Sequence, residues 1–264
     1  MDPSELFDLN GRVALVTGGG THLGRAMAEA LAAQGANTYI VGRRNDVLEE
    51  TAESMRSRGW TCREMTMDIT DEAQVNRVVD EIAAEAGAPD IVVCNAGASS
   101  ETEYPPFTDV SNLLGTIESH VVGTIITANS VARHMAQRGS GSIVTISSVH
   151  GSLAADPRLY ENLTQMSRRS SLAYQTSKAA LLGVTRNLAA ELGRSGIRVN
   201  CISPGHIPKD TADPKFVKRV VDGNALGIMG VPEDLKGAVV LLASDAGRFI
   251  TGQNLIVDAG WSIW

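Results

Sequence analysis

The feature that most constrains this chain is a regular alternation of short apolar runs with helix-like stretches. The apolar runs are predicted strands, at residues 12–17, 38–41, 61–67, 91–94, 142–147, 198–202 and 255–257. Apolar periodicity and caps predict helices at 23–34, 45–58, 112–137 and 173–194, and a further helix that Thr70 or Asp71 can cap. Strands separated by helices imply right-handed crossovers and a parallel sheet, and near-continuous apolar strands suit burial on both faces.

This alternation predicts the α/β class, with a doubly wound, Rossmann-like parallel sheet between two layers of helices. The chain has 264 residues, of which 43% are hydrophobic and 20% charged, which is ordinary for a globular protein. Because the motifs described below span nearly its whole length, we expect a single domain over residues 1–264. Two polar segments, at about 150–172 and 205–225, break the alternation, and we expect them to be loops that hold a substrate.

Charge and composition exclude several classes of partner. A formal net charge of −7 argues against nucleic acid and against an anionic membrane, and 4% aromatic residues argue against a stacking platform for single strands. No apolar run approaches the roughly 18 residues of a membrane span, and the N-terminus has no apolar signal region. Cys62, Cys94 and Cys201 fall in predicted strands without metal-ligand spacing. We therefore expect a cytoplasmic protein with reduced thiols, no metal and a small-molecule substrate.

A glycine-rich turn joins the first predicted strand to the first predicted helix. It runs from Thr17 through Gly18-Gly19-Gly20 to Gly24. Glycines permit a tight turn in which the backbone approaches a pyrophosphate, and the helix N-terminus offers unpaired N–H groups with a partial positive charge. The turn follows a strand and opens a helix, so it predicts a dinucleotide site.

The turn resembles the TGxxxGxG fingerprint of the short-chain dehydrogenase/reductase family, which Thr17, Gly18 and Gly24 match. The resemblance covers roughly residues 9–260 and implies an NAD(P)-dependent oxidoreductase, loosely similar to gluconate and sugar dehydrogenases. His22 stands where the family has its second glycine, so its backbone is strained if φ is positive there. Its imidazole is either merely tolerated in the first helical turn or lies beside a cofactor phosphate.

The end of the second predicted strand indicates which cofactor binds. An acidic residue there would bond the ribose 2′-hydroxyl of NAD and repel a 2′-phosphate. This chain instead has Gly42 followed by Arg43 and Arg44, and a guanidinium offers a planar fork of donors to a phosphate. We therefore expect NADP(H), with NAD(H) as the alternative if the arginines are merely solvated.

Three further segments resemble cofactor contacts of the family. Asp68-Ile69 resembles the pair whose carboxylate meets the adenine amino group, and Asn95-Ala96-Gly97 resembles the turn beneath the cofactor. Pro204-Gly205 with Ile207 resembles the segment against the nicotinamide amide. Together these arguments predict a cofactor site formed by Gly18, Thr21, His22, Leu23, Gly24, Arg43, Arg44, Asp68, Ile69, Asn95, Ala96, Gly97, Tyr174, Lys178, Pro204, Gly205 and Ile207.

A YxxxK pair, Tyr174 and Lys178, carries the predicted chemistry. Residues i and i+4 share one helix face, and an ammonium near the phenol would lower the tyrosine pKa from about 10. Tyr174 could then exchange a proton with an alcohol or carbonyl. Ser148 resembles the family serine that holds the substrate oxygen. The gap from Ser148 to Tyr174 is about twice the family's, which indicates an insertion, and Tyr160 has no lysine four residues later.

The fourth catalytic position of the family is an asparagine in an NxxG pattern, and here it is His120, followed by Gly123. The resemblance implies that an asparagine at this position bends the helix and holds a water that relays protons from the lysine. An imidazole could relay protons too, and a pKa near 6.5 would add a pH dependence. The alternative is that His120 only fills space.

The two polar segments carry the predicted substrate contacts. His150, Arg158, Arg168, Arg169 and His206 cluster there, so we predict that they bind substrate together with Ser148 and Tyr174. A local positive field would hold an anion, such as a sugar acid or another carboxylated or sulfonated polyol. The alternative is a solvated lid whose arginines pair with Asp156 or Glu161.

Two other functions stay open at this point. A 3-oxoacyl-thioester reductase would need an apolar groove, and the polar loops argue mildly against it. A non-catalytic NADP-binding regulator would fit a lost relay at His120, but the intact Ser148, Tyr174 and Lys178 count against it. The family resemblance also implies a homo-oligomer, a tetramer or dimer, formed partly through the helices at 112–137 and 173–194, with Trp261 and Trp264 at a subunit contact.

Overall fold

The structure is a computed structural model that describes residues 2–3, 5–98, 109–163, 171–209 and 212–264. Its centre is one parallel sheet in the strand order β3-β2-β1-β4-β5-β6-β7, which confirms the predicted fold class. The strands are β1 Val13–Thr17, β2 Asn37–Gly42, β3 Cys62–Thr66, β4 Ile91–Cys94, β5 Gly141–Ile146, β6 Ile197–Pro204 and β7 Asn254–Val257.

Strand β1 lies at the point where the strand order reverses. It pairs with β2 on one edge, where Val13 lies opposite Asn37, and with β4 on the other, where Ala14 lies opposite Ile91. All residues of β1 and β4 are buried, as their unbroken apolar sequences predict. Connections leave the sheet in opposite directions on the two sides of this point, so a crevice opens at the carboxyl ends of β1 and β4.

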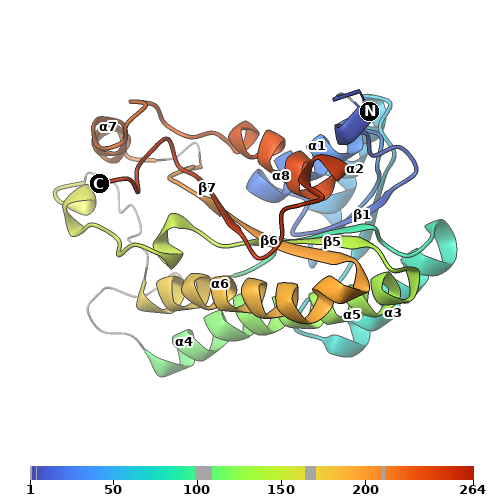
Figure 1. The fold of residues 1–264 in the computed structure, drawn as a ribbon. Helices are drawn as coiled ribbons and strands as arrows, with labels where there is room; N and C mark the ends of the chain where they lie inside the picture. Colours follow the sequence, from blue (N-terminus) through green and yellow to red (C-terminus); the bar gives the residue numbers. More distant parts are fainter. Residues whose placement is uncertain (1, 4, 99–108, 164–170, 210–211) are drawn as a thin grey trace.

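Helices cover both faces of the sheet (Figure 1). One buried cluster joins the sheet to α1, α2 and α8, and a second joins it to α3, α5 and α6. The helices are α1 His22–Ala33, α2 Asn45–Ser57, α3 Glu72–Ala86, α4 Val110–Ile117, α5 Gly123–Arg138, α6 Leu172–Leu192, α7 Pro214–Gly223 and α8 Lys236–Ala243. The side chain of Asp71 caps α3 by accepting the backbone N–H of Gln74 at 3.0 Å, so Asp71, rather than Thr70, is the cap.

The single helix predicted at 112–137 is interrupted in the structure. A π-helical segment, Glu118–Val122, separates α4 from α5 and contains His120. Such a segment bulges the backbone and commonly marks a functional site. Apolar periodicity alone does not distinguish it from regular helix, because the residues on both sides keep helical spacing.

The two segments predicted as loops contain short helices. Residues 205–225 include α7, and residues 150–172 include 3₁₀ turns at Val149–Gly151 and Pro157–Tyr160. Leu159 packs against Phe216 and Val220 of α7 in a small cluster apart from the two main ones. Helix α8 was not predicted from the sequence either. No helix in the described part of the chain is long and apolar enough to cross a membrane.

Candidate active site

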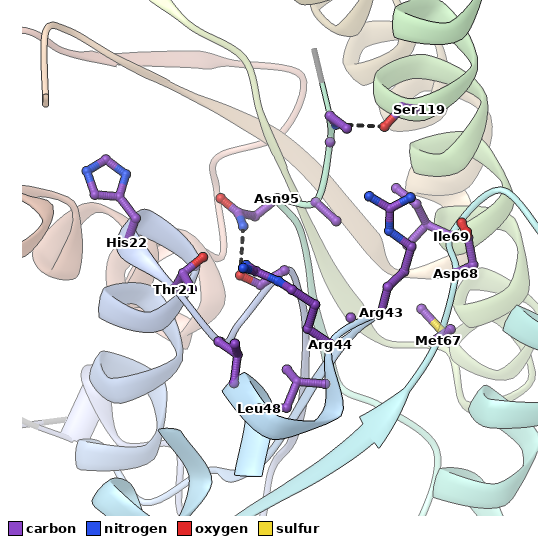
Figure 2. Close-up of a pocket in the computed structure, with 18 of the residues that line it drawn as sticks. Thr21, His22, Arg43, Arg44, Leu48, Met67, Asp68, Ile69, Asn95 and Ser119 are labelled. Atoms are coloured by element: carbon purple, nitrogen blue, oxygen red, sulfur yellow. Dashed lines mark hydrogen bonds between the residues drawn. The ribbon is translucent and has the colours of Figure 1, made fainter. Parts of the chain in front are cut away.

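A cleft of about 570 Å³ opens at the carboxyl ends of β1, β2 and β4 (Figure 2). The predicted cofactor residues that line it are Gly18, Thr21, His22, Leu23, Gly24, Arg43, Arg44, Asp68, Ile69, Asn95, Ala96 and Gly97. The sequence analysis missed other lining residues, notably Leu48, Met67 and Ser119. The structure therefore brings the glycine-rich turn and the ends of three neighbouring strands to one cleft.

Glycines in the first turn allow very close backbone approach. Gly18 has φ of +66°, and a Cβ atom on Gly24 would lie 2.1 Å from the carbonyl oxygen of Gly18. The amide of Asn95 donates to the carbonyl of Thr17 at 3.0 Å. Thr17 Oγ1 accepts the backbone N–H groups of Asn95 and Ala96, both at 3.0 Å. The turn is thus fixed to the end of β4, and its tight curvature leaves room for a ligand over the N-terminus of α1.

His22 occupies the left-handed backbone conformation, with φ of +47°. The strain predicted for a non-glycine residue at this position is therefore present. Its Nε2 lies 3.4 Å from the carbonyl oxygen of Pro208, in the segment that follows β6. The imidazole thus reaches across the end of the cleft, beside the lining residue Lys209.

The guanidinium groups of Arg43 and Arg44 make the cleft electropositive at the end of β2. Both side chains are exposed, and neither forms an ion pair within the described residues. Hydrogen bonds from the backbone and side chain of Thr70 lower the pKa of Asp68, and the charge of Arg43 lowers it further. Figure 2 shows Arg43 beside Asp68 and Ile69. The cleft therefore offers two cations to a phosphate group at the strand end where the sequence predicted them.

Five of the predicted cofactor residues do not line this cleft: Tyr174 and Lys178, which lie among the catalytic groups described below, and Pro204, Gly205 and Ile207. Gly205 and Ile207 line a second cavity, and Pro204 is buried at the end of β6, where it pairs with Val257. A Cβ atom on Gly205 would lie 2.6 Å from Cα of Asp258, so the close approach of Gly205 is to the chain after β7.

The predicted catalytic groups meet between β5 and α6. Ser148 follows β5, and its Oγ accepts the backbone N–H of His150 at 3.2 Å. The ammonium of Lys178 donates to the carbonyl of Ile146 at 2.9 Å and lies 5.6 Å from the centre of the Tyr174 ring. The structure therefore brings Ser148, Tyr174 and Lys178 together, as the i, i+4 spacing and the strand end predict.

The protonation states correct one expectation. Burial raises the pKa of Tyr174, although a hydrogen bond with Ser148 opposes this shift, so the expected lowering by the ammonium is wrong for this structure. Burial also lowers the pKa of Lys178 to about 8. For both groups removal from water is the largest cause of the shift, and it favours the neutral form because the charged form loses its hydration.

His120 is held in a defined orientation by α6. Its Nδ1 lies 2.7 Å from Ser177 Oγ, and that hydroxyl donates its one proton to the carbonyl of Tyr174. Nδ1 must then carry the imidazole proton, which leaves Nε2 as an acceptor. A Cβ atom on Gly97 would lie 2.5 Å from Nε2, so the acceptor edge of the ring faces the turn after β4. Its ring centre lies 5.7 Å from that of Tyr174.

The expected pH dependence of His120 near neutrality is not supported. Burial, and then the charge of Lys178, lower its pKa to about 3. The imidazole is therefore neutral at physiological pH. It can accept or pass on a proton only transiently.

The predicted substrate residues differ in their surroundings. Arg158 has a side chain that is 83% exposed and forms a bidentate pair with Asp156, at 2.7–3.0 Å. For this arginine the structure therefore shows the alternative to substrate binding, an ion pair on a solvated segment. Arg168 and Arg169 lie outside the described residues. Burial lowers the pKa of His150 and that of His206, the latter to about 4, so neither adds to a positive field as expected.

The sequence analysis gave no role to Ser177 or Ser119, and it named Thr17 only as part of the fingerprint. Ser177 holds His120, Thr17 fixes the turn after β4, and Ser119 Oγ accepts the backbone N–H of Ala98 at 2.7 Å. Ser177 carried a usable signal, because it lies three residues after Tyr174 on the same helix. Among the described residues, no group of three or more His, Cys, Asp or Glu side chains could hold a metal ion.

Comparisons with known proteins show which chains this one is similar to. A family model described as enoyl-(acyl carrier protein) reductase matches residues 20–262. The chain is 32% identical over 254 residues to a cis-4-hydroxycyclohexanecarboxylate dehydrogenase of Sinomonas cyclohexanicum, covering 95% of this chain and 96% of the relative. It is 31% identical over 270 residues to a gluconate 5-dehydrogenase of Gluconobacter oxydans (strain 621H), covering 100% and 99%.

A solved structure shares the whole fold. It is a gluconate 5-dehydrogenase from Burkholderia cenocepacia J2315 in complex with NADP and tartrate. The TM-score is 0.87 at 30% identity, and the alignment covers 99% of each chain. The chain is thus similar throughout to dehydrogenases that act on hydroxyl-bearing substrates.

The neutral His120 should make the protein sensitive to mild acid. Its folded pKa, about 3, lies below the value near 6.5 expected in the unfolded chain. The unfolded state therefore binds a proton first as pH falls, and stability is lost between about pH 6.5 and 3. Lowering the pH from 7 to 5 should cost about 2 kcal/mol of unfolding free energy through this residue. Denaturant titrations at pH 7 and pH 5 measure this loss of unfolding free energy.

The variant His120→Asn should lack that part of the acid sensitivity. His134→Asn is the matched control, because His134 lies on α5, partly exposed, and pairs with Asp80. An equal loss of acid sensitivity in both variants would contradict the assignment to His120.

Proposed function

Since the chain belongs to the short-chain dehydrogenase/reductase family, and is therefore an oxidoreductase acting on CH–OH groups, we propose that it transfers a hydride between NADP(H) and a secondary alcohol or its ketone. The observation that carries this proposal is the meeting of Ser148, Tyr174 and Lys178 behind β5. Full-length relatives named as dehydrogenases of hydroxylated substrates support it. They favour this reaction over the alternative, in which the enzyme reduces the 3-keto group of a 3-oxoacyl thioester.

The cleft suits a dinucleotide that carries an extra phosphate. The glycine-rich backbone and the N-terminus of α1 would hold the pyrophosphate, and Lys209 would add a charge to it. Arg43 and Arg44 would hold a 2′-phosphate. Asp68 and the turn at 95–97 would hold the adenosine half. When bound, the nicotinamide supplies or accepts the hydride, and the protein handles the proton.

The proton belongs to Tyr174 in this proposal. Because burial raises the pKa of Tyr174, its phenol is protonated at neutral pH and can donate to a ketone oxygen. Ser148 would hold the same oxygen through its hydroxyl, where negative charge develops. Lys178 would keep positive charge behind the phenol, and His120 would accept a hydrogen bond at Nε2 on the path to solvent.

For the substrate, we propose a polar molecule that carries a carboxylate or sulfonate, such as a sugar acid. The gluconate 5-dehydrogenase relative and the tartrate in the Burkholderia complex support this class. With His150 and His206 neutral and Arg158 paired, the anion would rely on Arg168 and Arg169.

We also propose that the chain is one domain and works as a homo-oligomer in the cytoplasm. Val110 and Leu114 on α4 and Leu172 on α6 are exposed by 65%, 62% and 56%, which supports contacts between copies along these helices. Free, buried thiols at Cys62, Cys94 and Cys201 support a reducing compartment.

Replacing Tyr174 with Phe tests the proton step. Turnover should fall by about 10²–10⁴-fold, because the proton donor is lost while the ring that packs in the site is kept. Steady-state rates and the fluorescence of bound NADPH measure turnover and cofactor affinity separately. Tyr39→Phe is the matched control, because Tyr39 is buried in β2 and does not line the cleft, and it should change turnover by less than about twofold. Equal effects of the two variants would refute the catalytic role.

Replacing Arg44 or Arg43 with Ala tests the choice of cofactor. Loss of a charge-assisted hydrogen bond to a phosphate should raise KM for NADP⁺ about 10–100-fold and leave KM for NAD⁺ nearly unchanged. Arg77→Ala, on the exposed face of α3, is the control. An equal rise in KM for both cofactors would show that neither arginine contacts the 2′-phosphate.

Replacing Arg168 or Arg169 with Ala tests the substrate class. A first screen identifies one sugar acid and its matching polyol that the wild type both turns over. Loss of one charge-assisted contact should then lower kcat/KM for the acid by about tenfold or more, with little change for the polyol. Unchanged kcat/KM for the acid in both variants would remove the anionic class from the proposal.

A further inference from the structure

His22 is a strained residue whose side chain the proposed function does not yet explain. Its φ of +47° lies in the left-handed region, which few residues with a Cβ atom adopt. A glycine, which the family resemblance places at this position, would adopt the same backbone without strain. Backbone strain at the edge of a binding site persists where the surrounding structure holds it, and it is commonly part of the function. We therefore expect the imidazole to make a contact that a glycine cannot make.

The imidazole connects two segments that are 186 residues apart in the chain. Its Nε2 lies 3.4 Å from the carbonyl oxygen of Pro208. A carbonyl can only accept, so Nε2 must carry the proton of this hydrogen bond. The side chain is half-buried and lines the cofactor cleft. His22 thus ties the glycine-rich turn to the segment after β6, across the end of the cleft.

Other contacts hold the start of this segment. The backbone N–H of Gly205 donates to a carbonyl of β7 at 2.8 Å, and Ile207 packs against the buried cluster that joins the sheet to α1, α2 and α8. Pro208 comes next and has no N–H of its own to donate. The hydrogen bond from His22 therefore extends the attachment of the segment by one residue, to the residue before Lys209.

Lys209 carries a charge that this attachment would place. Its side chain lines the cofactor cleft, is exposed and forms no ion pair within the described residues. In Figure 2, His22 and Arg43 lie on opposite sides of Asn95. Lys209, which follows the partner of His22, therefore adds positive charge at the end of the cleft away from the arginines. The glycine-rich turn and the N-terminus of α1 lie at that end, and a pyrophosphate would bind there.

The tie affects how readily the ammonium reaches a phosphate. A lysine side chain has many rotamers, and bringing its ammonium to a ligand costs conformational entropy. Holding the backbone at Pro208 restricts where the side chain of Lys209 begins. Such preorganisation strengthens binding because less freedom is lost when the ligand arrives.

We propose that His22 is a positioning residue for the cofactor: by donating to the carbonyl of Pro208, it holds the segment after β6 so that the ammonium of Lys209 stays beside the pyrophosphate. This inference rests on the proposed binding of a nicotinamide dinucleotide. A glycine at position 22 would relieve the strain but lose the tie. Because NAD(H) and NADP(H) share the pyrophosphate, His22 affects the binding of both, unlike a residue that contacts the 2′-phosphate.

Three substitutions of His22 test the tie through the Kd of NADPH and of NADH, measured by the fluorescence of the bound cofactor. His22→Gly should raise both Kd values about 3–10-fold, as expected for the loss of one neutral hydrogen bond. His22→Asn tolerates the same backbone conformation but is too short to reach Pro208, so it should match His22→Gly. His22→Gln carries an N–H donor as many bonds from the backbone as Nε2, and it should restore both Kd values to within about twofold.

A double-mutant cycle separates the positioning of Lys209 from a direct contact between His22 and the cofactor. Lys209→Met keeps the bulk of the side chain and should raise both Kd values about tenfold or more, because a charge-assisted contact is lost. Adding His22→Asn to Lys209→Met should raise them by less than about a further twofold, because the tie then has no charge to place. His134→Asn, on α5, is the matched control and should leave both Kd values unchanged. Independent, multiplying effects of the two substitutions would overturn the positioning role.

The binding data distinguish this inference from the proposed function. Binding of both cofactors with Kd values that no His22 variant changes would overturn the inference alone. A rise in Kd for NADPH only would also overturn it, because His22 would then act at the 2′-phosphate. Binding that depends on His22 and Lys209, without turnover of any alcohol, would overturn the proposed reaction and support the inference. A wild type that binds neither cofactor would overturn both.

Discussion

The hydroxyl of Thr17 joins the two strands on which the whole site depends. It donates to the carbonyl of Val93 at 3.3 Å and accepts the N–H groups of Asn95 and Ala96. Strands β1 and β4 diverge here, because their connections run to opposite sides of the sheet. The side-chain amide of Asn95 adds a second link by donating to the carbonyls of Thr17 and Gly18. Together these bonds hold the turn after β4, which contains Gly97, against the glycine-rich turn that lines the cleft.

Burial affects the pKa values of the groups between β5 and α6 more than charge pairing does. It raises the pKa of Tyr174 and lowers those of Lys178 and His120, in each case as the largest cause. Each shift favours the neutral form, because a charged group loses its hydration in the interior. A site of this kind is suited to moving a proton between neutral partners, and the ammonium of Lys178 is the charge most easily lost as pH rises toward 8.

Local patterns predicted the sheet and the cofactor turn well, since unbroken apolar strands and a strand–glycine–helix sequence act over a few residues. Apolar periodicity did not show the π-helical break at 118–122, because the residues on both sides keep helical spacing. Helices α7 and α8 were missed, although α7 carries local signals, with Asp213 as its cap and Pro214 in its first turn. At the site, strand ends and the i, i+4 spacing placed Ser148, Tyr174 and Lys178 together. The direction of the Tyr174 pKa shift was wrong because burial cannot be read from spacing, and the roles of the site residues stay predictions.

The two halves of the site differ in charge and in exposure to solvent. The cleft at the end of β2 exposes Arg43 and Arg44 without ion-pair partners among the described residues, whereas His120 and His206 are buried and neutral. Exposed cations attract an anionic cofactor at little desolvation cost. In the proposed mechanism, buried neutral groups would hold the reacting oxygen by hydrogen bonds, Tyr174 would supply the proton, and the ammonium of Lys178 would be the one charge beside them. Cofactor binding and proton transfer would then fall to different residues.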